Sequence, residues 1–215
     1  MHHSEQYYQM ISEKRKTKIK EIIDHRLSSI TIVLENIYDS HNANAVIRTC
    51  EAFGITTLHL IQTAEPFFTA KRIVAGSSKW VDVKIWQNAK ECFDFLHQNN
   101  FVIYTSAIHH SSISIWDIEF NQQTALVFGN EHAGISEMAH KLTDGNFIIP
   151  MYGFTESFNI SVAAGISASI ACMRRRQFLN SAGDLSLQQK TNMEKYFLEK
   201  SLPKSLRPRI TVESV

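Results

Sequence analysis

Short runs of β-branched and aliphatic residues alternate with helical segments along most of this chain of 215 residues. Such runs predict buried strands, and here they cover residues 30–34, 57–61, 81–85, 101–104, 124–128 and 147–149. The spacing of apolar residues or the composition predicts helices between and after these runs, at residues 44–53, 87–98, 136–142 and 159–178. The alternation predicts an α/β fold with a mainly parallel sheet flanked by helices.

Two further segments lie outside the alternating region. Residues 1–28 are polar and rich in charge, and we expect them to form a basic helical extension. Residues 179–215 are expected to form a C-terminal helical extension that contains an amphipathic helix over roughly 185–199. Residues 29–178 then make up the main domain, a length that suits one compact core.

Composition disfavours several classes of protein. No apolar run reaches the roughly 18 residues that span a membrane, and the N-terminus has no signal-peptide pattern, so we expect a cytoplasmic protein without membrane contact. The three cysteines lack the spacing of a zinc site or a disulfide framework, so no metal is expected. Neither GxGxxG nor GxxxxGK[ST] occurs, which disfavours a nicotinamide-dependent oxidoreductase and a P-loop enzyme.

Basic residues gather near the two ends of the chain, although the net charge is only +1. The N-terminal cluster includes Lys14, Arg15, Lys18 and Arg26, and an arginine triplet occupies 174–176. Further basic residues lie between 200 and 209. Each cluster can bind RNA phosphates, or it can be the solvated face of a helix.

Three unusual stretches follow predicted strands, at residues 36–48, 129–136 and 149–159. Because ligands of parallel sheets bind at the carboxyl ends of the strands, all three are candidates for a site. In the first stretch, Asn42 is expected to cap the following helix, which would let Arg48 face the same edge of the sheet. The planar guanidinium of Arg48 is suited to binding a phosphate or a ribose. A plain helix cap and a surface cation are the structural alternatives.

The other two stretches combine glycine with polar side chains. Gly129 and Gly134 flank Glu131, which either allows the backbone to approach a ligand closely or forms an ordinary turn. After Ile149-Pro150-Met151, Ser157 or Asn159 can cap the next helix, and a ligand can bind at the same helix start.

In their order and spacing, the three stretches resemble motifs 1, 2 and 3 of the SpoU/TrmH family of SPOUT methyltransferases. The resemblance extends over roughly residues 30–178 and is carried by Asn42 with Arg48, by Gly129-x-Glu131-x-x-Gly134, and by Ile149-Pro150-Met151 followed by Ser157-x-Asn159-x-Ser161-x-Ala163. It implies a deep trefoil knot in the C-terminal part of the domain, S-adenosyl-L-methionine as the cofactor, and a homodimer with its active site at the interface.

The resemblance also implies roles for single residues. The catalytic set would be Arg48, Asn42, Glu131, Ser157 and Asn159, and the cofactor-binding set would be Ser106, Gly129, Ile149, Met151 and Phe158. Because a guanidinium stays protonated, we expect Arg48 to bind a phosphate and stabilise the developing alkoxide. An arginine deprotonated by its surroundings is the less favoured alternative. Glu131 would either take part in local hydrogen bonding or fix its loop.

The basic N-terminal segment, residues 71–80 and the C-terminal tail are most similar to the branch of the family that methylates the 2′-hydroxyl of guanosine 18 in the D-loop of tRNA. Lys14, Arg15, Lys18 and Arg26 would then bind the RNA. Two alternatives remain open: a SpoU-type enzyme that acts on rRNA or on another tRNA position, and a catalytically silent RNA-binding protein on the same scaffold.

Overall fold

The computed structural model describes residues 9–63, 79–130, 133–203 and 205. The chain divides into two compact units. The larger unit is Leu27–Ser181, and the smaller unit combines the two ends of the chain, Met1–Arg26 and Ala182–Val215.

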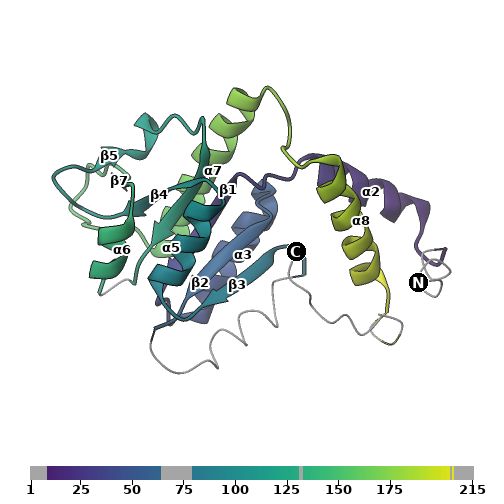
Figure 1. The fold of residues 1–215 in the computed structure, drawn as a ribbon, viewed down its shortest axis with the longest axis horizontal. Coiled ribbons are helices and arrows are strands. Elements are labelled where there is room, and N and C mark those ends of the chain that lie inside the picture. The colour runs from purple at the N-terminus through teal and green to yellow at the C-terminus, as the bar shows by residue number, and fades with distance from the viewer. Residues whose placement is uncertain (1–8, 64–78, 131–132, 204, 206–215) are drawn as a thin grey trace. The chain divides into compact units, whose positions relative to one another are not determined.

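A seven-stranded sheet lies at the centre of the larger unit (Figure 1). All its strand pairings are parallel, in the order β3-β2-β1-β6-β4-β7-β5. The strands are β1 (Ile30–Glu35), β2 (Thr57–Ile61), β3 (Asp82–Trp86), β4 (Phe101–Ser106), β5 (Ile113–Ser114), β6 (Gln123–Phe128) and β7 (Gly145–Ile148). Six of them coincide with the predicted runs to within about two residues. The sequence did not predict β5 or the 3-10 helix η1 (Ile115–Asp117), since segments this short carry no periodic pattern.

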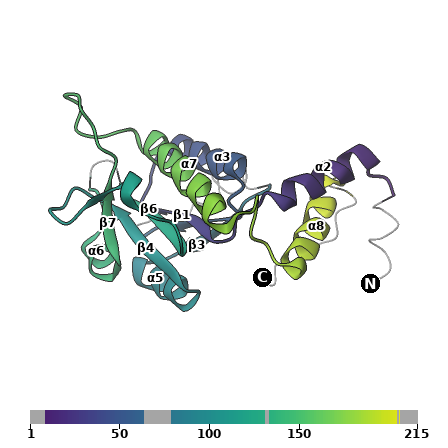
Figure 2. The ribbon, with the colours of Figure 1, turned by 90° about the horizontal axis from the view of Figure 1, so that it is seen from above.

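Helices cover both faces of the sheet (Figure 2). On one face lie α3 (Ser40–Phe53) and α7 (Ile160–Leu179), and on the other lie α5 (Ala89–Gln98) and α6 (Glu137–Leu142). Strand β1 packs against helices on both faces of the sheet, because Leu34 packs with α3 and α7 whereas Val33 packs with α5 and α6. Burial on both faces explains the uninterrupted apolar runs in the sequence.

Small residues allow α7 to lie close to α3. Ala164 and Ala168 are fully buried in this layer, in the same apolar cluster as Val46 and Ile47 of α3. The Ala-, Ser- and Gly-rich composition of this segment is therefore a packing feature. It brings the start of α7 close to the start of α3, where the candidate site lies.

The arginine triplet at the end of α7 takes part in hydrogen bonds within the larger unit. The guanidinium groups of Arg174, Arg175 and Arg176 donate to the carbonyl oxygen of Ile118 (2.9 Å), the hydroxyl of Ser29 (2.8 Å) and the carbonyl oxygen of Phe53 (2.8 Å), respectively. These bonds connect the end of α7 to the end of α3 and to the segments just before β1 and just after η1.

The three cysteines are buried free thiols. Burial raises the pKa of the Cys50 and Cys92 thiols above their ordinary value, because a thiolate is poorly solvated in the core. Both side chains therefore act as small apolar core residues.

In its described part, the smaller unit contains the helices α2 (Glu13–Asp24) and α8 (Leu187–Ser201), which pack against each other. Lys190 forms an ion pair with Asp24 at 2.6 Å, and Lys20 lies 3.8 Å from Glu194. Helix α8 matches the amphipathic helix predicted for the C-terminal segment. In the described ranges, none of the helices is both long and apolar enough to cross a bilayer.

Candidate active site at the carboxyl edge of the sheet

The first predicted stretch follows β1 and forms the beginning of α3. Asp39 is the N-cap of this helix, and its carboxylate accepts a hydrogen bond from the main-chain N–H of His41 at 2.8 Å. Asn42 therefore lies inside the first turn, and the expectation that it caps the helix is wrong. Asp and Asn are both favoured caps, and the earlier Asp39 takes the position.

Asn42 nevertheless lies at the centre of the site, since it joins the first stretch to the third. The Nδ2 atom of Asn159 donates a hydrogen bond to Oδ1 of Asn42 at 3.1 Å. Asn159 is also the N-cap of α7, where its Oδ1 accepts from the main-chain N–H of Ser161 at 2.9 Å and from the Ser161 hydroxyl at 2.6 Å. Both ends of the Asn159 amide are therefore used, which fixes its orientation.

The second stretch forms a tight loop after β6. Asn130 and Gly134 exchange two main-chain hydrogen bonds, at 3.0 and 2.8 Å. Gly134 has a φ of 68°, and a Cβ atom at Gly129 would lie 2.2 Å from the carbonyl oxygen of Gly134. Both positions therefore require glycine, because of the turn at one and the close approach at the other. Glu131, which the resemblance placed in the catalytic set, lies outside the described residues.

Arg48 lies on the exposed side of α3. It is six residues after Asn42, which is about 9 Å further along the helix axis and about 120° around it. No hydrogen bond or ion pair joins Arg48 to another described residue of this chain. The structure therefore brings Asn42 and Asn159 together but does not bring Arg48 into contact with either.

The residues expected to bind the cofactor lie at the ends of three neighbouring strands. Ser106 ends β4, Gly129 follows β6, and Ile149 follows β7. Met151 and Phe158 belong to the connection between β7 and α7, in which residues 151–158 form no hydrogen bond with any other described residue. The main-chain N–H and C=O groups of this connection are therefore available to a ligand. Ser157 is exposed in the same connection.

The predicted RNA-binding residues divide into two groups. Lys14, Arg15 and Lys18 are exposed on α2. Arg26 is only 1% exposed, and its guanidinium lies 5.4 Å from the centre of the Phe197 ring. The side chain of Arg26 is therefore buried in this chain, and its role in RNA binding stays a prediction.

Residues that sequence reasoning did not single out hold the second stretch in place. Both carboxylate oxygens of Glu35 accept hydrogen bonds from Ser136, one from its hydroxyl at 2.6 Å and one from its main-chain N–H at 2.9 Å. The side-chain amide of Asn130 donates to the carbonyl oxygen of Asn36 at 3.0 Å. The signal in the sequence was the acidic Glu35 that ends the apolar run of β1.

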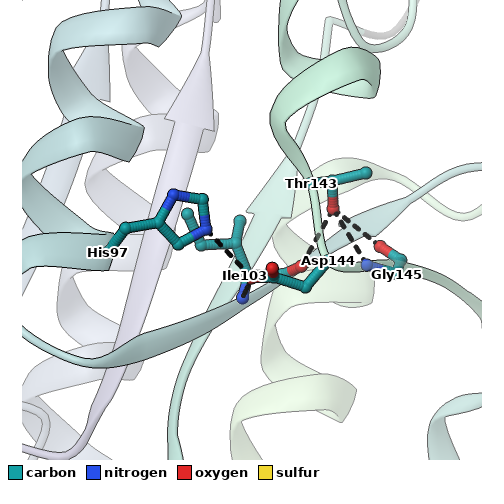
Figure 3. A network of polar contacts seen from close by, with 5 residues as sticks. All are labelled: His97, Ile103, Thr143, Asp144 and Gly145. Carbon is teal, nitrogen blue, oxygen red and sulfur yellow. Dashed lines mark hydrogen bonds and ion pairs between the residues drawn. The ribbon is translucent and has the colours of Figure 1, made fainter.

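A second polar network fixes the strand that leads into the third stretch (Figure 3). Oδ2 of Asp144 accepts a hydrogen bond from the main-chain N–H of Ile103 at 2.7 Å and lies 3.0 Å from Nε2 of His97. The hydroxyl of Thr143 lies 2.9 Å from the carbonyl oxygen of Ile103 and 2.7 Å from that of Gly145. Because these contacts join the start of β7 to β4, they set the register of β7 and the point at which residues 149–159 begin.

Comparison with known proteins identifies the family. The SpoU rRNA methylase family matches residues 29–169, about two thirds of the chain. This chain belongs to that family. SpoU methylases take their methyl group from S-adenosylmethionine, and the chain is a SpoU-family RNA methyltransferase that uses this cofactor.

Relatives with described activities are similar over most of the chain. The tRNA (guanosine(18)-2′-O)-methyltransferase of Thermus thermophilus is 34% identical over 155 residues, which are 72% of this chain and 80% of the relative. The enzyme of the same description from Borreliella burgdorferi is 34% identical over 167 residues, 78% of this chain and 77% of the relative. The crystal structure of the Aquifex aeolicus TrmH/SpoU tRNA modifying enzyme matches with a TM-score of 0.73 at 27% identity, covering 89% of this chain and 98% of that one.

Proposed function

We propose that this SpoU-family RNA 2′-O-methyltransferase transfers a methyl group to the ribose 2′-hydroxyl of guanosine 18 in tRNA. The support comes from the guanosine-18 methyltransferases that are similar over 72–78% of the chain. The Aquifex aeolicus tRNA modifying enzyme adds to it, because that match covers 89% of the chain and so extends beyond the matched family region of residues 29–169.

The residues at the carboxyl edge fit S-adenosylmethionine by their chemistry. Adenine and the methionine moiety are recognised by N–H donors and carbonyl acceptors, and residues 151–158 offer such main-chain groups without other described partners. Ser106, Gly129, Ile149, Met151 and Phe158 would hold the cofactor. When bound, it supplies an electrophilic methyl group on a positively charged sulfur.

Positioning of the ribose would come from Asn42, Asn159 and Ser157. The Asn42–Asn159 hydrogen bond sets the start of α7 against the start of α3, and Ser157 is exposed two residues before Asn159. A rigid polar edge of this kind lowers the entropic cost of aligning a hydroxyl for attack. Glu131 would have a local role in its loop.

Arg48 would bind the phosphate next to the reactive ribose and stabilise negative charge that develops on the 2′-oxygen. A guanidinium remains protonated near neutral pH and has no lone pair to accept the proton, so Arg48 is assigned electrostatic stabilisation and not proton removal. Its exposed position on α3, without a described partner in its own chain, leaves the guanidinium accessible to RNA.

We further propose that the protein is a homodimer with the active site at the interface and that its C-terminal part forms the trefoil knot expected of the family. Asn42 and Asn159 meet within one chain, whereas Arg48 contacts neither of them. A second protomer that brings its Arg48 to this Asn42–Asn159 pair would complete the site.

Lys14, Arg15 and Lys18 on α2 would bind the phosphates of the tRNA. The alternative functions are methylation of rRNA or of another tRNA position, and RNA binding without catalysis. The family description itself names rRNA, which keeps that substrate as the second candidate.

The test is incubation of the protein with labelled S-adenosylmethionine and an unmodified tRNA transcript, followed by mapping of the methylated ribose. The proposal predicts label at the 2′-oxygen of guanosine 18, and its loss from a transcript with 2′-deoxyguanosine at that position. Label at another tRNA position, or on an rRNA transcript alone, would assign one of the alternative substrates. Absence of label from both RNAs would support RNA binding without catalysis.

A further inference from the structure

Two consecutive residues at the end of β1 hold the two ends of the glycine loop. Asn36 accepts a hydrogen bond from Asn130, at the start of the loop, through its main-chain carbonyl oxygen at 3.0 Å. Glu35 accepts two hydrogen bonds from Ser136, which follows the loop. Asn130 and Ser136 are therefore both hydrogen-bonded to the same strand end.

The carboxylate of Glu35 is unusual in its position, because the residue is only 1% exposed. A buried carboxylate is tolerated only where strong donors replace its water, and here Ser136 supplies both of the donors described. An apolar residue at position 35 would extend the buried strand without this requirement. The two carboxylate oxygens fix both the main chain and the side chain of Ser136, which an apolar residue cannot do.

Ser136 also connects Glu35 to α6, because it is the N-cap residue of this helix. Its Oγ accepts a hydrogen bond from the main-chain N–H of Ala139 at 3.2 Å as the N-cap of the helix, while it donates to Glu35 at 2.6 Å. One hydroxyl thus connects the end of β1 to the start of α6, with the glycine loop between them. Asn36 also connects to the end of β2, since its main-chain N–H donates to the carbonyl oxygen of Ile61 at 2.8 Å.

We propose that Glu35 is a positioning residue for S-adenosylmethionine binding, acting through Ser136 on the Gly129–Gly134 loop. The inference rests on the proposed function in one respect, namely that this loop holds the cofactor. Glu35 does not touch the cofactor. It keeps the close approach of Gly129 to Gly134 in one geometry before the cofactor binds.

The experiment compares Glu35→Gln, Ser136→Ala and Ser136→Thr with the unchanged protein. Glutamine has the same shape as glutamate, but one carboxylate oxygen is replaced by an N–H₂ donor. Because Ser136 donates both of its hydrogen bonds to Glu35, one of them loses its acceptor. Alanine removes the hydroxyl, and threonine restores it. Asn88→Ala is the matched control, because Asn88 is the N-cap of α5 and its Oδ1 accepts from the N–H of Glu91 at 2.9 Å. Like Ser136→Ala, this variant loses a cap in the larger unit, but at a distance in sequence from the loop.

The readouts are the Kd of S-adenosylhomocysteine by calorimetry, the melting temperature, and hydrogen exchange of peptides covering 129–136. Glu35→Gln and Ser136→Ala are expected to raise the Kd by about tenfold or more and to speed exchange in the loop, since each loses a hydrogen bond with a charged group. Ser136→Thr should restore most of the affinity. Asn88→Ala should lower the melting temperature with the Kd within about twofold of the original.

A Kd for Glu35→Gln within twofold of the original, or a rise equal to that of Asn88→Ala, would overturn the inference while leaving the proposed function intact. Failure of the unchanged protein to bind S-adenosylhomocysteine would instead overturn the proposed function and the inference together.

Discussion

In the proposed function, Arg48 stabilises the negative charge that develops on the 2′-oxygen. Arg48→Ala removes the positive guanidinium from an exposed position. The fold and the binding of the cofactor should therefore be unchanged. We expect kcat/KM for methyl transfer to fall about 100-fold or more, as for other groups that stabilise an oxyanion. The measurement is steady-state kinetics together with the Kd of S-adenosylhomocysteine.

Arg48→Lys is the control, because lysine keeps the positive charge but lacks the planar guanidinium with its several N–H donors. This variant should regain only part of the activity that Arg48→Ala loses. An Arg48→Ala variant with full activity would exclude Arg48 from the reaction.

Asn159 performs two tasks that a single substitution can separate. Asn159→Asp keeps the oxygen that caps α7 but replaces the Nδ2 donor to Asn42 with a second acceptor. We therefore expect a melting temperature near the original and a clear loss of kcat. Asn159→Ala loses the cap as well, at a cost of about 1 kcal/mol in the free energy of unfolding.

Chemical denaturation and single-turnover kinetics check both Asn159 variants. Equal activity in Asn159→Asp and the original protein would show that the contact with Asn42 has no part in catalysis.

At the scale of elements, the sequence predicted the order and nature of nearly all strands and helices, because the apolar runs and the helical spacing are long. The sequence did not predict which of several suitable residues close together in the chain takes a given structural role. Asp39 and Asn42 are both good caps, and only the structure decides between them. For the arginine triplet the sequence left two alternatives open, and it could not indicate these hydrogen bonds, because the carbonyl and hydroxyl oxygens that accept them belong to residues far away in sequence.

The buried end of α7 gives a test of this structural role. Arg175 is only 8% exposed, and it donates to the hydroxyl of Ser29 at 2.8 Å and to the carbonyl oxygen of Phe120 at 3.4 Å. Arg175→Met keeps much of the side-chain volume but leaves both oxygens without this donor. We expect the free energy of unfolding to fall by about 1–3 kcal/mol, measured by urea denaturation.

RNA affinity in Arg175→Met should stay unchanged in filter binding under native conditions. A variant of unchanged stability that binds tRNA more weakly would instead make this arginine a phosphate ligand.

At the scale of the whole molecule, the proposed function places RNA binding in the smaller unit and methyl transfer in the larger one. Charge reversal at Lys14 and Lys18 should therefore raise the KM for tRNA while leaving the Kd of the cofactor unchanged. The slope of log K against log salt should become shallower by about one for each phosphate that the variant no longer binds.

Lys90→Glu is the control for charge reversal, since Lys90 is a surface residue of α5 that pairs with Asp94. If Lys90→Glu raised the KM for tRNA as much as the α2 substitutions do, the effect would be one of net charge and the assignment to α2 would be wrong.

The candidate site was predictable from the sequence in part, for a reason of topology. Parallel strands end at one edge, so the stretches after β1, β6 and β7 had to lie near one another, and the Asn42–Asn159 hydrogen bond joins two of them. The hydrogen bonds of Glu35 with Ser136 were not predictable, because nothing in the sequence states which loop a buried carboxylate at a strand end will meet. Nor did the basic character of Arg26 indicate that it would be interior.

The most direct test of the account is a crystal structure of the protein with S-adenosylhomocysteine. The account predicts the ligand between the 129–134 loop and the 149–159 connection, with Arg48 of the same or of a second protomer beside its sulfur. A ligand bound elsewhere, or an Arg48 remote from it in every protomer, would contradict the account.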